Sequence, residues 1–178
     1  MAVRERTITE ARDDELDAVC ALLTRANEEF RARLDPAAFT SYLQMVLDLE
    51  SRRAASTLIV ASVDERLVGT VTFYPVASDE GWGAEPGSAG LRAMAVDPEA
   101  RGLGIGRALV EACVARARAR GSTALTLHTA AWLTDAVALY ERCGFARDPA
   151  GDLRASDIMD VPLWADYPAL AYRRSLLD

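Results

Sequence analysis

The segment that most constrains this 178-residue chain is 91–107, with the sequence LRAMAVDPEARGLGIGR. A short apolar run comes first, a proline turn follows, and a loop rich in glycine and arginine leads into a helical pattern. This order places several backbone N–H groups at the start of a helix, where an anionic ligand is favoured. Gly102, Gly104 and Gly106 leave the backbone uncovered, and Arg101 adds a positive charge. The segment therefore predicts a site for a phosphate-bearing ligand.

The glycine spacing distinguishes this loop from two familiar phosphate loops. A Walker loop needs Lys and then Ser or Thr after its last glycine, but Gly106 is followed by Arg107 and Ala108. A dinucleotide fingerprint needs Gly or Ala at its sixth position, which Arg107 or Leu109 occupies here. The pattern that remains is R-x-x-G-x-G over residues 101–106. Taken alone, it is equally compatible with a plain turn between a strand and a helix.

A second pattern lies downstream. Residues 124–129 (ALTLHT) have the alternating character of a strand. Apolar residues at helical spacing then precede Gly144-Phe145, namely Ala136, Leu139, Tyr140 and Cys143. Together with the R-x-x-G-x-G loop, the run A-x-x-L-Y-x-x-x-G-F resembles the two signatures of the GNAT (N-acetyltransferase) superfamily, in that family's order. The resemblance covers residues 58–145 well and the flanking segments only by general pattern.

The resemblance implies one GNAT domain over residues 1–178, with the α/β acyl-CoA N-acyltransferase fold. That fold has a mixed central sheet of about seven strands flanked by about four helices, with splayed fourth and fifth strands. It also implies direct transfer of an acetyl group from the co-substrate acetyl-CoA to a primary amine, without a metal. Homodimers are common in the family, so a homodimer is one expectation.

Local signals along the chain predict the same α/β order. Expected strands cover residues 3–9, 57–63, 67–76, 91–96, 123–129, 145–148 and 170–176. Expected helices begin at four places: at Asp13 or Asp14, at Asp35-Pro36, at Gly104 and at Trp132. Residues 77–90, rich in glycine and acidic side chains, predict a loop.

For the donor, the resemblance implies that loop amides bind the CoA pyrophosphate and that one strand pairs with the pantetheine arm as an added strand would. The implied cofactor-binding residues are Met94, Ala95, Val96, Arg101, Gly102, Leu103, Gly104, Ile105, Gly106 and Arg107. A backbone N–H near Met94 or Ala95 would stabilise the thioester oxygen. Leu133 stands where the family often has an Asn that contacts the CoA arm, so we expect CoA binding to depend mainly on backbone groups.

For catalysis, the tyrosine of the second signature lies near the CoA sulfur in the family, which makes Tyr140 the candidate general acid. A tyrosine with a pKa of about 10 holds its proton at neutral pH and can donate it to the departing thiolate. The alternative is that Tyr140 fills the apolar helix face, with its hydroxyl bonded to backbone.

The strand at 91–96 carries no carboxylate to act as a base. Candidate bases elsewhere are Glu28 and Glu29 at the end of the first helix, and His128, the chain's one histidine. The alternatives are a solvated helix end, a histidine bonded within the sheet, and proton loss through water.

Acidic and aromatic residues gather in two segments, 79–85 and 148–168, and such walls would suit a cationic amine. Solvated loops on an acidic protein are the alternative. The favoured function is acetyl transfer to a small-molecule amine. The rival is a CoA-binding module without turnover, and a protein-lysine acetyltransferase has less support.

The net charge of −7 argues against a nucleic-acid partner. No run approaches the roughly 18 apolar residues of a membrane helix, and the first residues lack the apolar core of a signal peptide. We therefore expect a cytoplasmic protein with no membrane partner. Cys20, Cys113 and Cys143 fall on apolar helix faces, which predicts buried free thiols.

Overall fold

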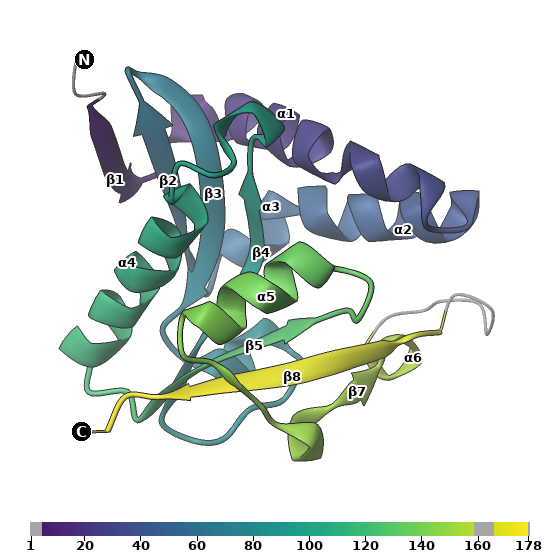
Figure 1. The fold of residues 1–178 in the computed structure, drawn as a ribbon. Coiled ribbons are helices and arrows are strands. Elements are labelled where there is room, and N and C mark those ends of the chain that lie inside the picture. Colours follow the sequence, from purple (N-terminus) through teal and green to yellow (C-terminus); the bar gives the residue numbers. More distant parts are fainter. Residues whose placement is uncertain (1–4, 159–165, 178) are drawn as a thin grey trace. The chain divides into compact units, whose positions relative to one another are not determined.

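The computed structural model describes residues 5–158 and 166–177 (Figure 1). The chain forms two compact units. Unit 1 comprises Met1–Phe73 and Ala93–Ala112, and unit 2 comprises Tyr74–Arg92 and Cys113–Asp178. Strand β4 (Ser88–Val96) and helix α4 (Ile105–Ala119) each begin in one unit and end in the other.

The first part of unit 1 is an antiparallel sheet. Strand β1 (Arg6–Glu10) pairs with β2 (Thr57–Val63), and β2 pairs with β3 (Arg66–Tyr74). Asp64 and Glu65 connect β2 to β3 with positive φ angles of 48° and 65°. Two successive positive φ angles characterise the tight hairpin turn that matches the twist of the strands. The strands predicted at 57–63 and 67–76 are confirmed, although β3 starts at Arg66 and ends at Tyr74.

Three helices of unit 1 are α1 (Leu16–Asn27), α2 (Pro36–Leu47) and α3 (Leu49–Arg53). The predicted start of α2 is confirmed, because the Asp35 carboxylate accepts a hydrogen bond from the Ala37 N–H at 2.9 Å. The predicted cap of α1 is wrong. Asp13 and Asp14 lie inside a 3₁₀ turn, and the Glu15 carboxylate accepts a hydrogen bond from the Arg12 N–H at 2.8 Å. Helix α3 was not predicted.

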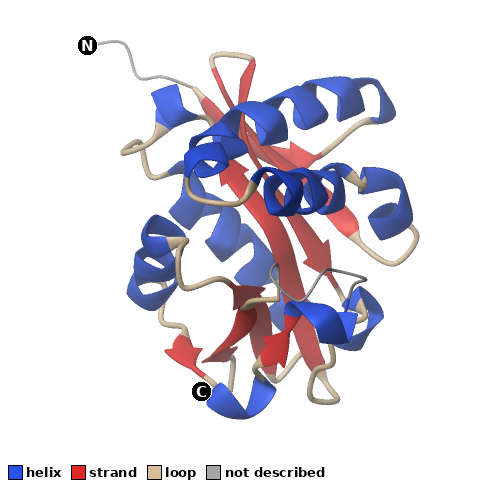
Figure 2. Cartoon of the chain, turned by 90° about the vertical axis from the view of Figure 1, so that its right-hand side faces the viewer, coloured by secondary structure: helices blue, strands red, loops and turns tan. Residues whose placement is uncertain are grey.

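The strands of unit 1 carry helices on both faces (Figures 1 and 2). Leu58 and Val60 of β2 pack in one core with residues of α1, α2 and α3. On the opposite face, Gly69 of β3 lies under α4. A Cβ at Gly69 would stand 2.7 Å from Ile105 Cγ2 and 3.1 Å from Leu109 Cδ1. The absence of a side chain at Gly69 therefore allows the first turns of α4 to pack closely against β3.

In unit 2, β4 pairs in parallel with β5 (Ala124–Thr129), and β5 pairs antiparallel with β8 (Pro168–Ser175). Strand β8 also pairs with the two-residue strands β6 (Ala146–Arg147) and β7 (Leu153–Arg154). The remaining helices are α5 (Thr134–Arg142) and α6 (Ala155–Ile158). This combination of parallel and antiparallel strands with flanking helices confirms the mixed α/β class. Eight strands and six α-helices lie within the described ranges.

The predicted loop at 77–90 is partly wrong. Ala77–Glu80 forms a 3₁₀ turn, and β4 already begins at Ser88. The Glu80 side chain is only 4% exposed and lies 3.7 Å from Arg92 Nε, so a buried ion pair ties this turn to β4. The sequence from residue 159 to 165, part of the second acidic segment, lies outside the described residues.

The three cysteines are free thiols, as predicted; Cys113 and Cys143 are buried and Cys20 is half-buried. Burial raises the pKa of Cys113 to about 12, so this thiol is unreactive at neutral pH. Over the part of the chain that the structure describes, no helix combines the length and the apolar character that crossing a membrane requires.

Candidate functional site

The loop between β4 and α4, residues 97–104, lies entirely in unit 1, and we refer to it as the anion cradle because its sequence predicts a phosphate site. Gly102 and Gly104 have φ angles of 79° and 75°, in the left-handed region that glycine adopts most easily. The first backbone hydrogen bond of α4 runs from the Ala108 N–H to the Gly104 carbonyl, at 3.0 Å. The N–H groups of the three residues before Ala108 therefore have no acceptor within the helix, and they are available to an anion.

Asp97 anchors this loop. Its side chain is 2% exposed and accepts hydrogen bonds from Arg25 Nη2 at 3.0 Å and Arg66 Nη2 at 3.2 Å. It also accepts the Glu99 N–H at 3.0 Å, while its own N–H donates to the Val68 carbonyl at 2.8 Å. Burial raises the pKa of Asp97, but the bonds from Glu99 and the two guanidinium groups outweigh burial and lower it overall. The end of β4 is thus fixed to α1 and β3.

Strand β4 contains one residue with an unusual backbone conformation. Ala93 has a φ of 49°, which is rare for a residue with a side chain and is typical of a bulge or a functional constraint. Within unit 2, the pairing of β4 with β5 runs from Ser88 to Gly90 and does not include Leu91 or Arg92. The residues that follow Ala93 are those predicted to meet the pantetheine arm.

The structure brings Arg101 and Glu29 together as an ion pair. Arg101 Nη2 donates to Glu29 Oε1 at 2.6 Å, and to the Ala26 carbonyl at 3.4 Å. Glu28 makes a separate pair with Arg31. The hydrogen bond from Arg31 lowers the pKa of Glu28, which makes this exposed carboxylate a weaker base. Both predicted carboxylates therefore have arginine partners.

Tyr140 lies on α5 in unit 2 and is 6% exposed. Its ring meets the Phe145 ring edge-on, with centroids 5.8 Å apart, and its carbonyl accepts the Phe145 N–H at 3.0 Å. Gly144 closes the helix with a φ of 83°, as its place in the second signature predicts. Leu133 stands at the start of α5 and makes no side-chain capping bond.

His128 lies on β5, also in unit 2, and both its ring nitrogens are covered. Nε2 is 2.9 Å from the Gly151 carbonyl, so Nε2 carries the proton and donates it. Nδ1 is buried without a hydrogen-bond partner among the described residues. Desolvation lowers the pKa of His128, against opposing effects of Gly151 and Asp152. Neutral His128 is therefore favoured, and it would need a rearrangement to accept a proton from a substrate.

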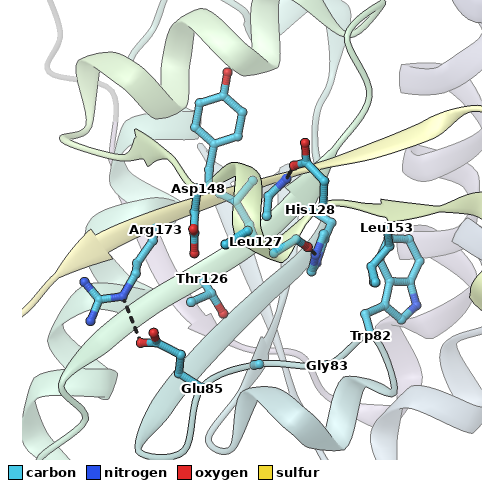
Figure 3. Close-up of a pocket in the computed structure, with 15 residues that line it drawn as sticks. Trp82, Gly83, Glu85, Thr126, Leu127, His128, Asp148, Leu153 and Arg173 are labelled. Carbon is cyan, nitrogen blue, oxygen red and sulfur yellow. Dashed lines mark hydrogen bonds and ion pairs between the residues drawn. The ribbon is translucent and has the colours of Figure 1, made fainter.

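A cavity of about 410 Å³ lies beside His128 in unit 2 (Figure 3). Its lining comes from residues 82–85, 126–128, 148, 150–153 and 171–173. It therefore brings together parts of the two acidic, aromatic segments that the sequence associates with an acceptor. Trp82 borders this cavity, with its ring centroid 5.5 Å from that of His128.

Most of the charged and aromatic side chains that line this cavity already contact arginine side chains of the protein. The Arg92 guanidinium stands 4.1 Å above the Trp82 ring, which occupies one face of the indole. Glu85 pairs with Arg173 at 3.3 Å, as Figure 3 shows. Asp152 pairs with Arg147 at 2.7 Å. Asp148 is the lining carboxylate that makes no ion pair with any residue the structure describes.

Sequence reasoning missed Gly69 and the role of Arg92. An isolated glycine within a strand pattern is a recognised sign of close backbone approach, so Gly69 carried a usable signal. The sequence gives no such signal for Arg92, because its contacts with Trp82 and Glu80 depend on how the turn before β4 folds. Within residues 5–158 and 166–177, no cluster of three or more His, Cys, Asp or Glu side chains is arranged to hold a metal ion.

Comparison with known proteins identifies the family. The profile of the acetyltransferase (GNAT) family matches residues 16–145, which include the loop, β4 and the second signature. A mycothiol acetyltransferase of Cellulomonas flavigena is 33% identical over 165 residues, covering 85% of this chain and 45% of that protein. An IAA acetyltransferase of Azospirillum brasilense is 44% identical over 68 residues, covering 38% of this chain and 44% of that protein. The chain thus spans about half the length of the curated relatives it matches.

Solved structures share the fold. The PaiA N-acetyltransferase of Thermoplasma acidophilum, crystallised with coenzyme A, superposes with a TM-score of 0.70 at 12% identity, over 96% of this chain and 99% of that one. The ribosomal-protein-S18-alanine N-acetyltransferase of Escherichia coli gives a TM-score of 0.66 at 19% identity, over 97% and 94%. This chain belongs to the GNAT acetyltransferase family.

Proposed function

We propose that this protein transfers the acetyl group of acetyl-CoA to a primary amine of a small molecule. The observation that carries the proposal is the anion cradle of unit 1. Gly102 and Gly104 hold left-handed conformations there, the first N–H groups of α4 are open, and Asp97 fixes the loop. A pyrophosphate has the charge and the acceptor oxygens that such a cradle binds.

In this proposal, backbone groups of residues 102–107 bind the pyrophosphate, and Met94, Ala95 and Val96 pair with the pantetheine arm. The positive φ of Ala93 supports a donor for the thioester oxygen close to this point, because it redirects the N–H groups that follow. A preorganised donor of this kind contributes about 3 kcal/mol to transition-state stabilisation. Arg101 holds the loop to the end of α1 through Glu29.

The chemistry is a direct displacement. The amine nitrogen attacks the thioester carbonyl carbon, a C–N bond forms, and the C–S bond breaks with its electron pair on sulfur. Tyr140 donates a proton to the thiolate as general acid, consistent with its position in the second signature. The amine loses its extra proton to solvent through water, because Glu28, Glu29 and His128 are engaged by Arg31, Arg101 and Gly151.

The acceptor class is inferred from the unit 2 cavity and from the relatives. A volume of about 410 Å³ admits a small molecule, and Asp148 offers an unpaired carboxylate to an ammonium group. The curated relatives include enzymes named for mycothiol, which favours a small-molecule acceptor over a protein lysine. The homodimer expected from the family resemblance stays a prediction, which light scattering tests.

The experiment is calorimetric titration with acetyl-CoA, followed by thiol release across a panel of small primary amines. Saturable binding with thiol release on any amine supports the proposal. Binding without release on the whole panel supports the rival function, a CoA-binding module. Absence of acetyl-CoA binding contradicts the role of the cradle, on which each step above depends.

A further inference from the structure

Arg6, at the start of β1, approaches the anion cradle from a distant part of the sequence. The backbone of β1 is held at this end by the pairing of Arg6 with Val63 and by hydrogen bonds between Glu5 and Asp64. Arg6 Nη1 lies 3.7 Å from the position that a Cβ on Gly104 would occupy. The Arg6 side chain is exposed and makes no ion pair with the residues that the structure describes.

A guanidinium group at this position is electrostatically unfavourable by itself. The start of a helix carries partial positive charge, which repels cations and attracts anions. The first turn of α4 contains no acidic residue and includes Arg107, so nothing within that turn compensates the charge of Arg6. A bound anion at Gly104 would supply the missing negative charge.

Arg101, by contrast, is already neutralised. Its guanidinium donates to the Glu29 carboxylate and to the Ala26 carbonyl. The sequence signature points to Arg101 as the cation of the loop, but the structure directs this side chain towards α1. Arg6, by contrast, approaches Gly104 with its guanidinium group and makes no ion pair with the described residues.

We propose that Arg6 contacts the pyrophosphate of the acyl donor and supplies the side-chain charge that Arg101 does not. The inference rests on the proposed function, since it requires the cradle to hold acetyl-CoA. It assigns a donor-binding role to a residue outside both family signatures, on the edge strand β1.

The test is calorimetric titration of the wild type and of Arg6→Gln with three ligands: CoA, 3′-dephospho-CoA and acetyl-pantetheine, which has no phosphate. One charge-assisted hydrogen bond corresponds to a loss of roughly 10- to 150-fold in affinity. We expect this loss for CoA and equally for 3′-dephospho-CoA, and no change for acetyl-pantetheine. Arg6→Lys should recover part of the affinity, because it restores the charge without the planar fork.

Arg12→Gln is the matched control. Arg12 is also an exposed arginine of unit 1 and its change removes the same charge, but its partners are Asp14 and Glu15. Unchanged CoA affinity in Arg12→Gln excludes a general effect of net charge. Equal affinities of the wild type and Arg6→Gln for CoA overturn the inference. A loss of affinity for CoA but not for 3′-dephospho-CoA also overturns it, because Arg6 would then contact the 3′-phosphate instead of the pyrophosphate. If the wild type does not bind CoA, the result refutes the proposed function itself rather than the specific role of Arg6.

Discussion

Asp97 offers the sharpest test of how the cradle is held. We predict that Asp97→Ala lowers the free energy of unfolding by about 2–3 kcal/mol. Loss of the bond to the Glu99 N–H resembles loss of a helix cap, which costs about 1 kcal/mol. The two guanidinium bonds contribute roughly 0.5–1 kcal/mol each, because Arg25 and Arg66 are 51% and 57% exposed and water solvates them once Asp97 is gone.

Asp97→Asn separates these contributions. The amide oxygen still accepts the Glu99 N–H, whereas its NH₂ group cannot pair with a guanidinium. We expect Asn to recover about 1 kcal/mol of the loss seen with Ala. Urea denaturation followed by circular dichroism measures both variants, and a loss of 2–3 kcal/mol corresponds to a fall in Tm of roughly 5–10 °C.

The same carboxylate predicts a pH dependence with a definite sign. Because the pKa of Asp97 is lower in the folded protein than in the unfolded chain, its contribution is present above the unfolded pKa of about 3.9 and is lost as the pH falls through the folded value. The difference in stability between wild type and Asp97→Asn should therefore shrink below about pH 4. This reasoning would be refuted if the free energy of unfolding of Asp97→Ala lay within about 0.5 kcal/mol of the wild-type value. It would also be refuted if the stability difference between wild type and Asp97→Asn did not change with pH.

The remaining predictions concern the cradle and the acid. Gly104→Glu should abolish measurable CoA binding in calorimetry, because a carboxylate would face the pyrophosphate; Gly121→Glu, with a similar φ of 74° and open space around it, should bind CoA like the wild type. Tyr140→Phe should lower kcat at least about 100-fold with little change in CoA affinity, and a near-normal rate would remove Tyr140 from the acid role. Gly69→Ala should cost about 1–3 kcal/mol in urea denaturation, since the new methyl meets Ile105 Cγ2, and Ile105→Leu in the same protein should relieve part of this cost.

Local signals in the sequence were enough to predict several turns and helix ends. Asp35 caps α2 and Gly144 closes α5, and Gly102 and Gly104 adopt the left-handed conformation that glycine permits. These features depend on neighbours within about four residues, which a single sequence displays. The failed cap of α1 shows the limit, because Asp13 and Asp14 form a 3₁₀ turn before the helix and no side chain caps α1 itself.

Pairings between distant charged residues were not predictable. Arg101 meets Glu29 across 72 positions, and Arg25 meets Asp97 across the same separation. An exposed arginine gains little from any single carboxylate, so the fold rather than the sequence selects its partner. The ion pair of Arg101 with Glu29 could not be predicted from the motif for this reason. The approach of Arg6 to Gly104 likewise depends on how β1 and α4 fold together.

The acidic composition of the two segments was a poor basis for predicting the acceptor, because the fold decides which carboxylates are paired with arginine. Two of the carboxylates that line the unit 2 cavity, Glu85 and Asp152, are neutralised by Arg173 and Arg147. Net charge counts every carboxylate equally, whereas a ligand interacts with those that lack a partner in the folded protein. Among the described residues that line this cavity, Asp148 is the carboxylate without an ion pair. Under the proposed function, an amine would therefore be recognised by one carboxylate rather than by a generally acidic wall.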